Sequence, residues 1–344
     1  MDLEEFSKEA NQHLIDYTRN ILAGCDEEFI ENVLYAIKIA APLRERTYLM
    51  FLSTGIMNLE WLKIEPFSFA FEYLIVSQLS IDDIIDSAHF RSNKPTLIIK
   101  TNKAKTILVS EYLHSIGYLT ILSQKLKWDI KILNEVLDEF NQTSNIFFQY
   151  QYMCSALEGK SKISLDTMDK LAYGRTGRLI EFSLTIPAII SEKYEIGNAL
   201  RVCGKWLGIA MQHRDDILDF ISDPDILGKP IFLDYLNEQP NLVTSFFELQ
   251  NIAQDTKTKI EELYKDLKNS KIRNISFNTE KIEEFLEIFK NEKAFELARN
   301  RVREYCLLAK NSLLSLPSSP YKSKLVNLIN IVASIDYPWE KNNV

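Results

Sequence analysis

Two aspartate clusters of identical spacing carry the strongest chemical signal in the chain: Asp82-Asp83-Ile84-Ile85-Asp86 and Asp215-Asp216-Ile217-Leu218-Asp219. Each follows a strongly apolar stretch, and residues four apart on a helix share a face, so the first and last aspartate of each cluster project together. Two such faces opposed across a cavity would form a carboxylate site for several Mg²⁺ ions. Magnesium held by few carboxylates keeps waters and takes up phosphate oxygens, so the pattern predicts a phosphate ester as substrate.

Two other interpretations of these clusters are weaker. Solvated acidic helix ends would explain one such cluster, but two copies within apolar helical sequence are far rarer by chance. An EF-hand is disfavoured because neither cluster has the alternating oxygen ligands, mid-loop glycine and terminal glutamate of that loop.

Composition limits the class of protein. The chain has 344 residues, 46% of them hydrophobic, and a formal net charge of −8, which disfavours nucleic acid or an anionic membrane surface as the main partner. No window approaches the roughly 20 apolar residues of a membrane span, and the acidic start is no signal peptide. Four scattered cysteines (Cys25, Cys154, Cys203 and Cys306) and four scattered histidines have no metal or disulfide spacing. We therefore expect a cytoplasmic protein with buried free thiols.

Apolar periodicity predicts one all-α domain over residues 1–344, because glycine and proline are scarce and short alternating segments are missing. The polar stretch Lys268–Thr279 is predicted to be a mobile loop. The predicted helices cover residues 3–21, 27–39, 46–58, 66–87, 102–124, 128–156, 166–191, 195–221, 241–267, 281–290, 292–314 and 319–334.

The faces that run back from the clusters predict what lies beneath the metals. Behind Asp215 they carry Met211, Gly208 and Gly204, and glycine inside a helix costs roughly 1 kcal/mol against alanine. Close helix packing and room for an apolar tunnel both explain these glycines. Behind Asp82 the face carries Gln78, Leu74 or Ile75, and Phe71. Metals at the mouth with hydrocarbon below would suit a long apolar phosphate ester.

These residues resemble the trans-isoprenyl diphosphate synthases, or polyprenyl synthetases, and their terpene-synthase relatives. The first cluster with Arg91 and Lys94-Pro95-Thr96 resembles the first aspartate-rich motif of that family, and the stretch from Leu207 to Asp219 is similar to the second. Between them, Gly174-Arg175-Thr176-Gly177 resembles a Lys-Thr segment with Arg in the Lys position. Gly228-Lys229-Pro230 and then Asp234 resemble the segment after the second motif.

The resemblance implies an isoprenoid synthase class I helical bundle around a central active-site cavity. It implies that Asp82, Asp86 and Asp215 hold three Mg²⁺ (Mn²⁺ being a possible substitute), with Asp83, Asp216 and Asp219 as further ligands or as their partners. It also implies that Arg91, Arg175 and Lys229 contact an allylic diphosphate. Thr176 and Gln212 would lie near the carbocation formed when that diphosphate departs. A homodimer through the mid-chain helices is a further expectation.

The chain departs from the family where elongating members bind isopentenyl diphosphate. The usual Gly-Gly-Lys-x-x-Arg segment reads Ala41-Pro42-Leu43-Arg44-Glu45-Arg46, in which Lys is replaced by Leu43 and Arg46 matches. The His or Gln seven residues before the first motif is Ile75, and an Arg-Arg pair reads Arg91-Ser92. Gln239 stands where a further Lys is usual. Each charge-assisted hydrogen bond to a phosphate is worth roughly 1.5–3 kcal/mol, and a shifted alignment through Arg44 would supply one at most.

Three hypotheses follow. The sequence favours a class I terpene synthase that ionises a C15–C20 prenyl diphosphate without isopentenyl diphosphate, or that transfers the prenyl group to another acceptor. An elongating synthase of farnesyl or geranylgeranyl type and a non-catalytic subunit of a heteromeric synthase are the alternatives. The family shortens its tunnel with bulky aromatics four and five residues before the first motif, where this chain has Gln78 and Ser77. We therefore expect room for a farnesyl chain or longer above a floor at Phe71.

Overall fold

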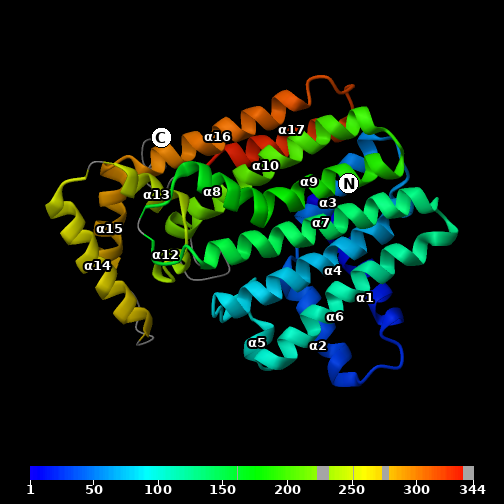
Figure 1. The fold of residues 1–344 in the computed structure, drawn as a ribbon, viewed down its shortest axis with the longest axis horizontal. Coiled ribbons are helices and arrows are strands. Elements are labelled where there is room, and N and C mark those ends of the chain that lie inside the picture. The colour runs from blue at the N-terminus through cyan, green and yellow to red at the C-terminus, as the bar shows by residue number, and fades with distance from the viewer. Residues whose placement is uncertain (161, 223–231, 251, 273–278, 336–344) are drawn as a thin grey trace.

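Long helices that run lengthwise beside one another make up most of the molecule (Figure 1). The computed structural model describes residues 1–160, 162–222, 232–250, 252–272 and 279–335. The elements of the first half are α1 (Leu3–Ile21), α2 (Glu27–Ala40), α3 (Glu45–Ile56), α4 (Trp61–Ile85), β1 (Phe90–Arg91), β2 (Lys94–Pro95), α5 (Leu97–Lys100), α6 (Lys103–Leu122), a 3₁₀ turn (Ser123–Leu126) and α7 (Ile130–Ser155).

The second half is also helical, and α14 and α15 stand at one end of the molecule, at the left of Figure 1. Its elements are α8 (Leu165–Ala172), a π-helical turn (Tyr173–Gly177), α9 (Arg178–Ile190), α10 (Tyr194–Ile221), α12 (Leu233–Leu236), α13 (Leu242–Leu249), α14 (Gln254–Ile272), α15 (Thr279–Asn291), α16 (Ala294–Ser312) and α17 (Pro320–Ala333). The all-α prediction is confirmed. None of the described helices is long and apolar enough to cross a membrane.

Capping residues explain where several predicted helices begin. The Asp2 carboxylate accepts a hydrogen bond from the Glu5 amide at the start of α1, and Asp26 does the same for the Phe29 amide in α2. Ser319 caps α17, whose first residue, Pro320, has no N–H to satisfy. These local signals are readable from the sequence, and the predicted starts of these three helices agree with the structure.

The structure differs from the predicted elements at several places. Helix α4 begins at Trp61 instead of residue 66, because Pro66 breaks only one early hydrogen bond while the turn before it buries Ile64. The predicted helix 241–267 is interrupted at Gln250, whose backbone is extended. Helix α14 continues to Ile272, so the predicted loop at Lys268–Thr279 is partly helical, and residues 273–278 lie outside the described part. The short hairpin β1–β2 was not predicted.

Helix α4 is the centre of the first half. One face carries Phe67, Phe71 and Ile75 into a core shared with α7 and α9, and the other carries Phe69 and Tyr73 into a core shared with α1, α2 and α6. Because apolar residues cover nearly its whole surface, α4 is held between two layers and ends with its aspartates at one end of the bundle.

Helix α10 is the centre of the second half and packs directly on the backbone of α9 and of the π-helical turn. A Cβ atom at Gly204 would lie 2.6 Å from Glu181 Cα, and one at Gly208 would lie 2.5 Å from Gly177 Cα. Of the two explanations for these glycines, close helix packing is therefore correct. The prediction that Gly208 lines a cavity was wrong, since its face is covered by Gly177.

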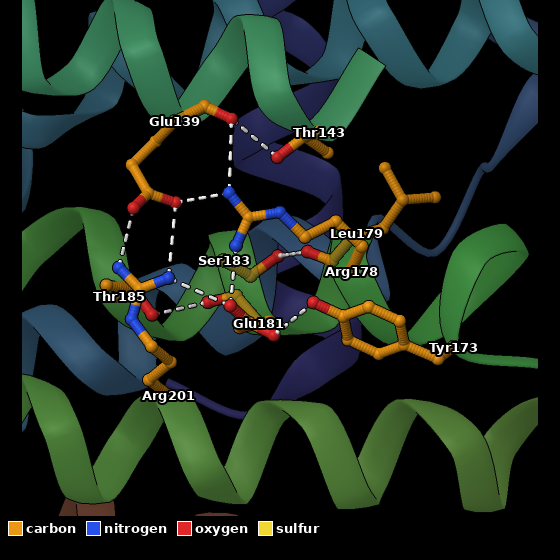
Figure 2. A network of polar contacts seen from close by, with 9 residues as sticks. All are labelled: Glu139, Thr143, Tyr173, Arg178, Leu179, Glu181, Ser183, Thr185 and Arg201. Carbon is orange, nitrogen blue, oxygen red and sulfur yellow. Dashed lines mark hydrogen bonds and ion pairs between the residues drawn. The ribbon is translucent and has the colours of Figure 1, made fainter. Parts of the chain in front are cut away.

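A buried polar network joins α7, α9 and α10 (Figure 2). The Arg178 guanidinium donates to Glu139 and, at 2.5 Å, to Glu181; Arg201 donates to the same two carboxylates at 2.7 and 2.8 Å. The Tyr173 hydroxyl donates to Glu181 at 3.0 Å. The network fixes the three helices against one another just beyond the π-helical turn.

Cysteine burial agrees only in part with the sequence prediction. Cys154, Cys203 and Cys306 are buried free thiols, and burial raises the pKa of Cys154 to about 11. Cys25 is exposed, because it lies in the turn between α1 and α2.

Replacing Arg178 tests the energetic weight of this network. Arg178→Met should lower the free energy of unfolding by about 3 kcal/mol, because the buried Glu181 and the partly buried Glu139 lose one of their two arginine partners. Urea denaturation of the purified protein measures the change. Lys170→Met, which breaks the exposed pair with Asp166, is the matched control and should leave the midpoint unchanged. Equal midpoints for both variants would show that Arg201 alone neutralises the carboxylates.

Candidate active site

A cavity of about 370 Å³ lies between the C-terminal end of α4 and α10, with the π-helical turn and the β1–β2 hairpin completing its walls. Both aspartate clusters contribute to it, as predicted. Its lining residues are Ala40, Arg46, Ile75, Gln78, Leu79, Asp82, Asp86, Ala88, Phe90, Arg91, Ser92, Phe147, Arg175, Thr176, Leu179, Gln212, Asp215 and Asp234. More than half of these side chains are charged or polar, so the prediction of a mostly apolar cavity was wrong.

The aspartates of the first cluster lie in two different environments. Asp82 and Asp86 line the cavity, whereas Asp83 is 3% exposed and turns away from it. Arg91 donates to Asp83 Oδ1 through Nε at 2.9 Å and through Nη2 at 2.7 Å. Asp83 thus orients Arg91, whose Nη2 lies 3.8 Å from Asp82 Oδ2 at the cavity wall.

Asp82 is surrounded by donors that hold it in place. Gln151 of α7 donates to its Oδ1 at 2.9 Å, and Arg175 Nη2 lies 4.0 Å from the same oxygen. Gln239 donates to Asp86 Oδ1. Gln239, where the family usually has Lys, therefore gives Asp86 a neutral partner.

The second cluster brings one aspartate to the cavity. Asp215 lines it, whereas Asp216 and Asp219 are buried behind the wall. Asp216 accepts from the Leu242 amide at 2.9 Å, and the Asp219 carbonyl accepts from the Phe232 amide at 2.7 Å. The Asp216 carboxylate and the Asp219 backbone carbonyl therefore hold the chain that follows α10, and whether the two residues are metal ligands or partners of ligands stays a prediction.

The π-helical turn places Arg175 and Thr176 in the opposite wall. A π turn within a helical run is frequent at functional sites, and it interrupts the predicted helix 166–191 at this point. The Thr176 hydroxyl donates to Gln212 Oε1 at 2.6 Å, and Gln212 Nε2 donates to Asp216 Oδ1 at 3.1 Å. The predicted residues Arg175, Thr176 and Gln212 are therefore brought together.

The region after the second cluster supplies residues that sequence reasoning missed or gave no role. Asp234 lines the cavity, and the Asn241 side chain donates to the Asp216 carbonyl at 2.9 Å. His213, to which the sequence assigns no function, is fully buried and lies 2.8 Å from Asp169 Oδ1. The neighbours of His213 in the sequence give no indication of this hydrogen bond, because Asp169 lies 44 residues away. Lys229 lies outside the described residues.

Charge in the cavity favours cation binding. Four aspartates and three arginines among the described residues line it, so a diphosphate would meet little net attraction from these side chains alone. Burial raises the pKa of Asp86 to about 7, and the neighbouring Asp82 and Asp234 add to that effect. A divalent cation would relieve this crowding, and oxygen donors of this kind suit magnesium.

The carboxylates do not form a complete ligand set by themselves. Within the part of the chain that the structure describes, no three acidic, histidine or cysteine side chains converge as one metal site. A cation between Asp82, Asp86 and Asp215 would therefore need further ligands from water or from substrate oxygens, as Mg²⁺ commonly does.

Among the described residues, the side of the cavity near α3 has one positively charged side chain. Arg46 lines it with a buried Nε that has no hydrogen-bond partner, whereas Leu43 is 52% exposed and lies outside the cavity. Arg44 is fully buried and binds Glu72 at 2.5 Å and the Ile37 carbonyl at 2.6 Å. The interpretation that Arg44 compensates for Leu43 at a substrate phosphate was therefore wrong.

The floor of the cavity is aliphatic, and aromatic side chains lie beneath it. Ile75 and Leu179 line it, and one turn below Ile75 the buried Phe71 ring stacks on Phe182 with centroids 4.7 Å apart. Phe71 therefore lies beneath the floor rather than in it. Met211 also does not line the cavity.

Ser77 belongs to a helix contact and not to the cavity wall. Its hydroxyl lies 3.0 Å from that of Ser110 in α6, whose own hydroxyl donates to the Ser77 carbonyl. The prediction that Ser77 lines the tunnel was wrong, because side chains one residue apart on a helix point about 100° apart.

Comparison with known proteins agrees with this geometry. A family model described as polyprenyl synthetase matches residues 28–282. The chain is 23% identical over 340 residues to octaprenyl diphosphate synthase of Haemophilus influenzae (98% of each chain) and 27% identical to all-trans-nonaprenyl-diphosphate synthase (geranyl-diphosphate specific) of Rhodobacter capsulatus (76% of this chain, 74% of the other). The chain belongs to the polyprenyl synthetase family.

Solved structures show the same fold. The geranylgeranyl pyrophosphate synthetase of Pyrococcus horikoshii superposes with a TM-score of 0.80 at 24% identity over 97% of this chain and 99% of that one. A polyprenyl synthase of Caulobacter crescentus, complexed with calcium and isoprenyl diphosphate, gives a TM-score of 0.78 at 17% identity over 97% and 96%. The fold is that of the isoprenyl synthases, as the sequence predicts. The named relatives are prenyl diphosphate synthases, so the comparisons favour the elongating alternative over the terpene synthase.

Removing the Asp86 charge tests the crowding of the carboxylates. An unfolded aspartate loses its proton near pH 4 and Asp86 near pH 7, so the stability of the metal-free protein should fall as the pH rises through this window. Asp86→Asn should abolish this decrease, and at pH 8 in EDTA the variant should exceed the wild type by up to about 4 kcal/mol. Urea unfolding at pH 4 and pH 8 measures it. A constant difference at the two pH values would contradict the assignment.

Proposed function

We propose that the protein is an elongating trans-prenyl diphosphate synthase that joins an allylic prenyl diphosphate to isopentenyl diphosphate. The observation that carries the proposal is one cavity in which Asp82, Asp86 and Asp215 face Arg175 and Thr176, in a chain of the polyprenyl synthetase family. Family membership places the chain among prenyltransferases of isoprenoid biosynthesis, and the elongation step is our proposal.

The cavity residues suit ionisation of the allylic substrate. Asp82, Asp86 and Asp215 would hold divalent cations, with three Mg²⁺ as the proposed number, and these cations would supply positive charge to the departing diphosphate. Arg175 would donate to the same diphosphate. The C1–O bond would break with its electron pair on the diphosphate. Thr176 and Gln212 line the cavity, and their side-chain oxygens would stabilise the positive charge of the carbocation.

The carbon–carbon bond then forms without an added oxidant or base from outside the site. The double bond of isopentenyl diphosphate supplies the electron pair to C1 of the cation, and the new tertiary cation loses a proton from C2 of the acceptor. The released diphosphate is an anionic oxygen acceptor for that proton. The products are a diphosphate five carbons longer, inorganic diphosphate and one proton.

A class I terpene synthase remains the second candidate, and a specific observation favours it. Ile75 and Ser92 line the cavity at positions where the resemblance leads us to expect polar or cationic contacts to isopentenyl diphosphate. Of the described residues on that side, Arg46 is the positively charged one. Such an enzyme would release hydrocarbon or alcohol from one prenyl diphosphate. A non-catalytic subunit is disfavoured because the cavity retains its carboxylates.

One assay separates these functions. The protein is incubated with Mg²⁺ and geranyl, farnesyl or geranylgeranyl diphosphate, each with and without isopentenyl diphosphate, and volatile and diphosphate products are analysed. Elongation predicts longer diphosphates that require isopentenyl diphosphate. Hydrocarbons or alcohols formed equally well without it would promote the terpene synthase.

Replacing a cavity aspartate should abolish turnover and preserve the fold. Asp82→Ala or Asp215→Ala removes oxygen ligands from the proposed metal site, so the rate should fall by about 10³-fold or more, as in other sites deprived of a main electrostatic contact. Because like charges are removed, the metal-free variants should unfold no earlier than the wild type. Product formation and thermal unfolding measure the two effects. Retained turnover in either variant would refute its role as a ligand.

Removing the aromatic ring beneath the cavity floor should lengthen the product. Phe71→Ala removes the ring that stacks on Phe182 and extends the cavity downward, at about 3–5 kcal/mol of stability. Chromatography of the dephosphorylated products should show a shift to longer chains by one or more five-carbon units. Phe69→Ala, on the opposite face of α4 against Tyr17, is the matched control and should keep the wild-type distribution. If the wild type, Phe71→Ala and Phe69→Ala give the same distribution, residues other than Phe71 limit the chain length of the product.

We also infer a homodimer through α6 and α7. Leu108 and Leu119 are exposed on one face of α6, and Tyr152 is 81% exposed beside Phe148 on α7. An apolar face of this kind on two adjacent helices is typical of a subunit interface. Light scattering should give twice the mass of the 39.9 kDa chain, and Leu108→Glu with Leu119→Glu should give monomers.

A further inference from the structure

A second groove lies at the end of α4 opposite to the aspartates. It has a volume of about 540 Å³ and lies between the first turns of α4 and the 3₁₀ turn that joins α6 to α7. Because a helix rises 1.5 Å per residue, the 20 residues from Leu62 to Asp82 place the groove about 30 Å from the candidate active site. Its lining residues are Leu62, Lys63, Pro66, Gln124, Lys127 and Trp128.

Large apolar side chains beside this groove are exposed. Leu126, between two lining residues in the sequence, is 92% exposed, and Leu62 in the groove wall is 71% exposed. Trp128 is half-buried, and its ring meets that of Phe67 in a T-shaped contact with centroids 6.2 Å apart. Single exposed apolar residues are ordinary, but a group around one groove marks an interaction surface. A tryptophan packed on one side and open on the other is typical of a membrane interface.

The charge of the segment Leu122–Lys131 is opposite in sign to that of the whole chain. The segment contains three lysines and one aspartate, whereas the chain has a net charge of −8. Lys131 and the nearby Lys63 have carboxylate partners at 4.0 and 3.3 Å. Lys125 and Lys127 are exposed, and neither ammonium group forms an ion pair with a carboxylate of the described residues. This end of the bundle can therefore attract an anion although the whole chain is acidic.

One buried acceptor in the groove wall has no partner. Gln124 is 6% exposed, and its Nε2 donates to the Ser123 hydroxyl at 2.9 Å. Its Oε1 is buried without a hydrogen-bond partner, which is costly unless a donor enters the groove. The ammonium groups of Lys63 and Lys127 belong to the same wall. Together these groups suit a ligand that carries both a phosphate and a hydroxyl.

We propose that this groove binds the headgroup of an anionic phospholipid and docks this end of the bundle on a bilayer. The phosphate would contact Lys127, a headgroup hydroxyl would donate to Gln124, and Leu126 would enter the acyl region. A protein partner is disfavoured because lysine is depleted in protein–protein interfaces. The proposal does not depend on the proposed function.

Sedimentation with vesicles tests the docking. The wild type should bind vesicles of phosphatidylcholine mixed with phosphatidylglycerol, bind pure phosphatidylcholine weakly, and dissociate as salt is added. Lys125→Gln with Lys127→Gln should lower the partition coefficient roughly thirtyfold, at about 1 kcal/mol for each lysine. Leu126→Glu should lower it about tenfold or more, because it replaces an inserted side chain by a repelled charge. A wild type that does not bind the anionic vesicles would overturn the proposal.

Matched controls lie at the other end of the molecule, where α13 and α14 stand (Figure 1). Lys259→Gln with Lys265→Gln removes the same charge from α14, and Leu249→Glu changes a leucine that is 49% exposed at the end of α13. Both controls should bind vesicles as the wild type does. Equal losses in the controls and in the groove variants would show that net charge drives the binding, which would also overturn the proposal.

Trp128 and Gln124 report on the groove itself. Phosphatidylglycerol with brominated acyl chains should quench the tryptophan fluorescence of the wild type, and Trp128→Phe should remove most of that quenching. Gln124→Leu should lower the partition coefficient about fivefold or more without an earlier thermal unfolding, because it removes an unpaired buried acceptor. Equal quenching in the wild type and Trp128→Phe would show that lipid contacts another part of the protein.

Two further measurements identify any other occupant. Light scattering of Leu126→Glu should give the wild-type mass; a lower mass together with unchanged vesicle binding would show a contact between copies of the chain instead. Dodecyl phosphate, added as a monomeric amphiphile, is the soluble probe. If it protects the wild type against thermal unfolding while anionic vesicles do not bind, the groove is a site for a free amphiphile and the bilayer proposal fails.

Discussion

Mutual repulsion among the carboxylates of one cavity is the constraint on which this structure depends. Asp82, Asp86, Asp215 and Asp234 line that cavity, and burial together with the neighbouring Asp82 and Asp234 raises the pKa of Asp86 to about 7. The fold opposes this repulsion with donors from other segments, such as Gln151 of α7 on Asp82 and Gln239, between α12 and α13, on Asp86. Bound cations would relieve the remaining repulsion, so in the proposed function the charges that weaken the metal-free protein are also those that bind the metal.

Packing between helices opposes a separation of the cavity walls that would relieve the repulsion between the carboxylates. Close backbone contact at Gly208 fastens α10 to the π-helical turn, and the network around Arg178 and Glu139 fastens α7 and α9 beside it (Figure 2). Gly177, which contacts Gly208, and Arg178 both follow closely after Arg175 in the sequence. The position of the arginine that faces the aspartates is thus set by packing and buried ion pairs rather than by a flexible loop.

The sequence predicted the fold class and most of the cavity, because its signals are local. Helix caps and apolar periodicity define the helices, and the spacing within each aspartate cluster places Asp82 and Asp86 on one face. The errors came from the rotation of the helices about their axes, which decides the face that is covered, and from contacts between residues far apart in the sequence. Ser77, Met211 and Gly208 were assigned to the cavity from helical spacing, but which face of α4 or α10 is covered depends on α6 and on the π-helical turn. The role of Arg44 depended on Glu72, 28 residues away. That the chain is one domain stays a prediction.

The π-helical turn also has a consequence for how this chain can change in length. A π turn accommodates one residue more than an α turn, so Tyr173–Gly177 behaves as an insertion absorbed within a helical run. Loss of one residue there would restore regular α geometry and leave α8 in nearly the same rotation relative to α9, because the wide turn holds the extra residue within itself. Asp169 on α8 would then keep its place beside His213, whereas the wide turn that puts Arg175 and Thr176 in the cavity wall would be lost. A single-residue deletion in this segment should therefore change the cavity and preserve the packing of the helices on either side of it.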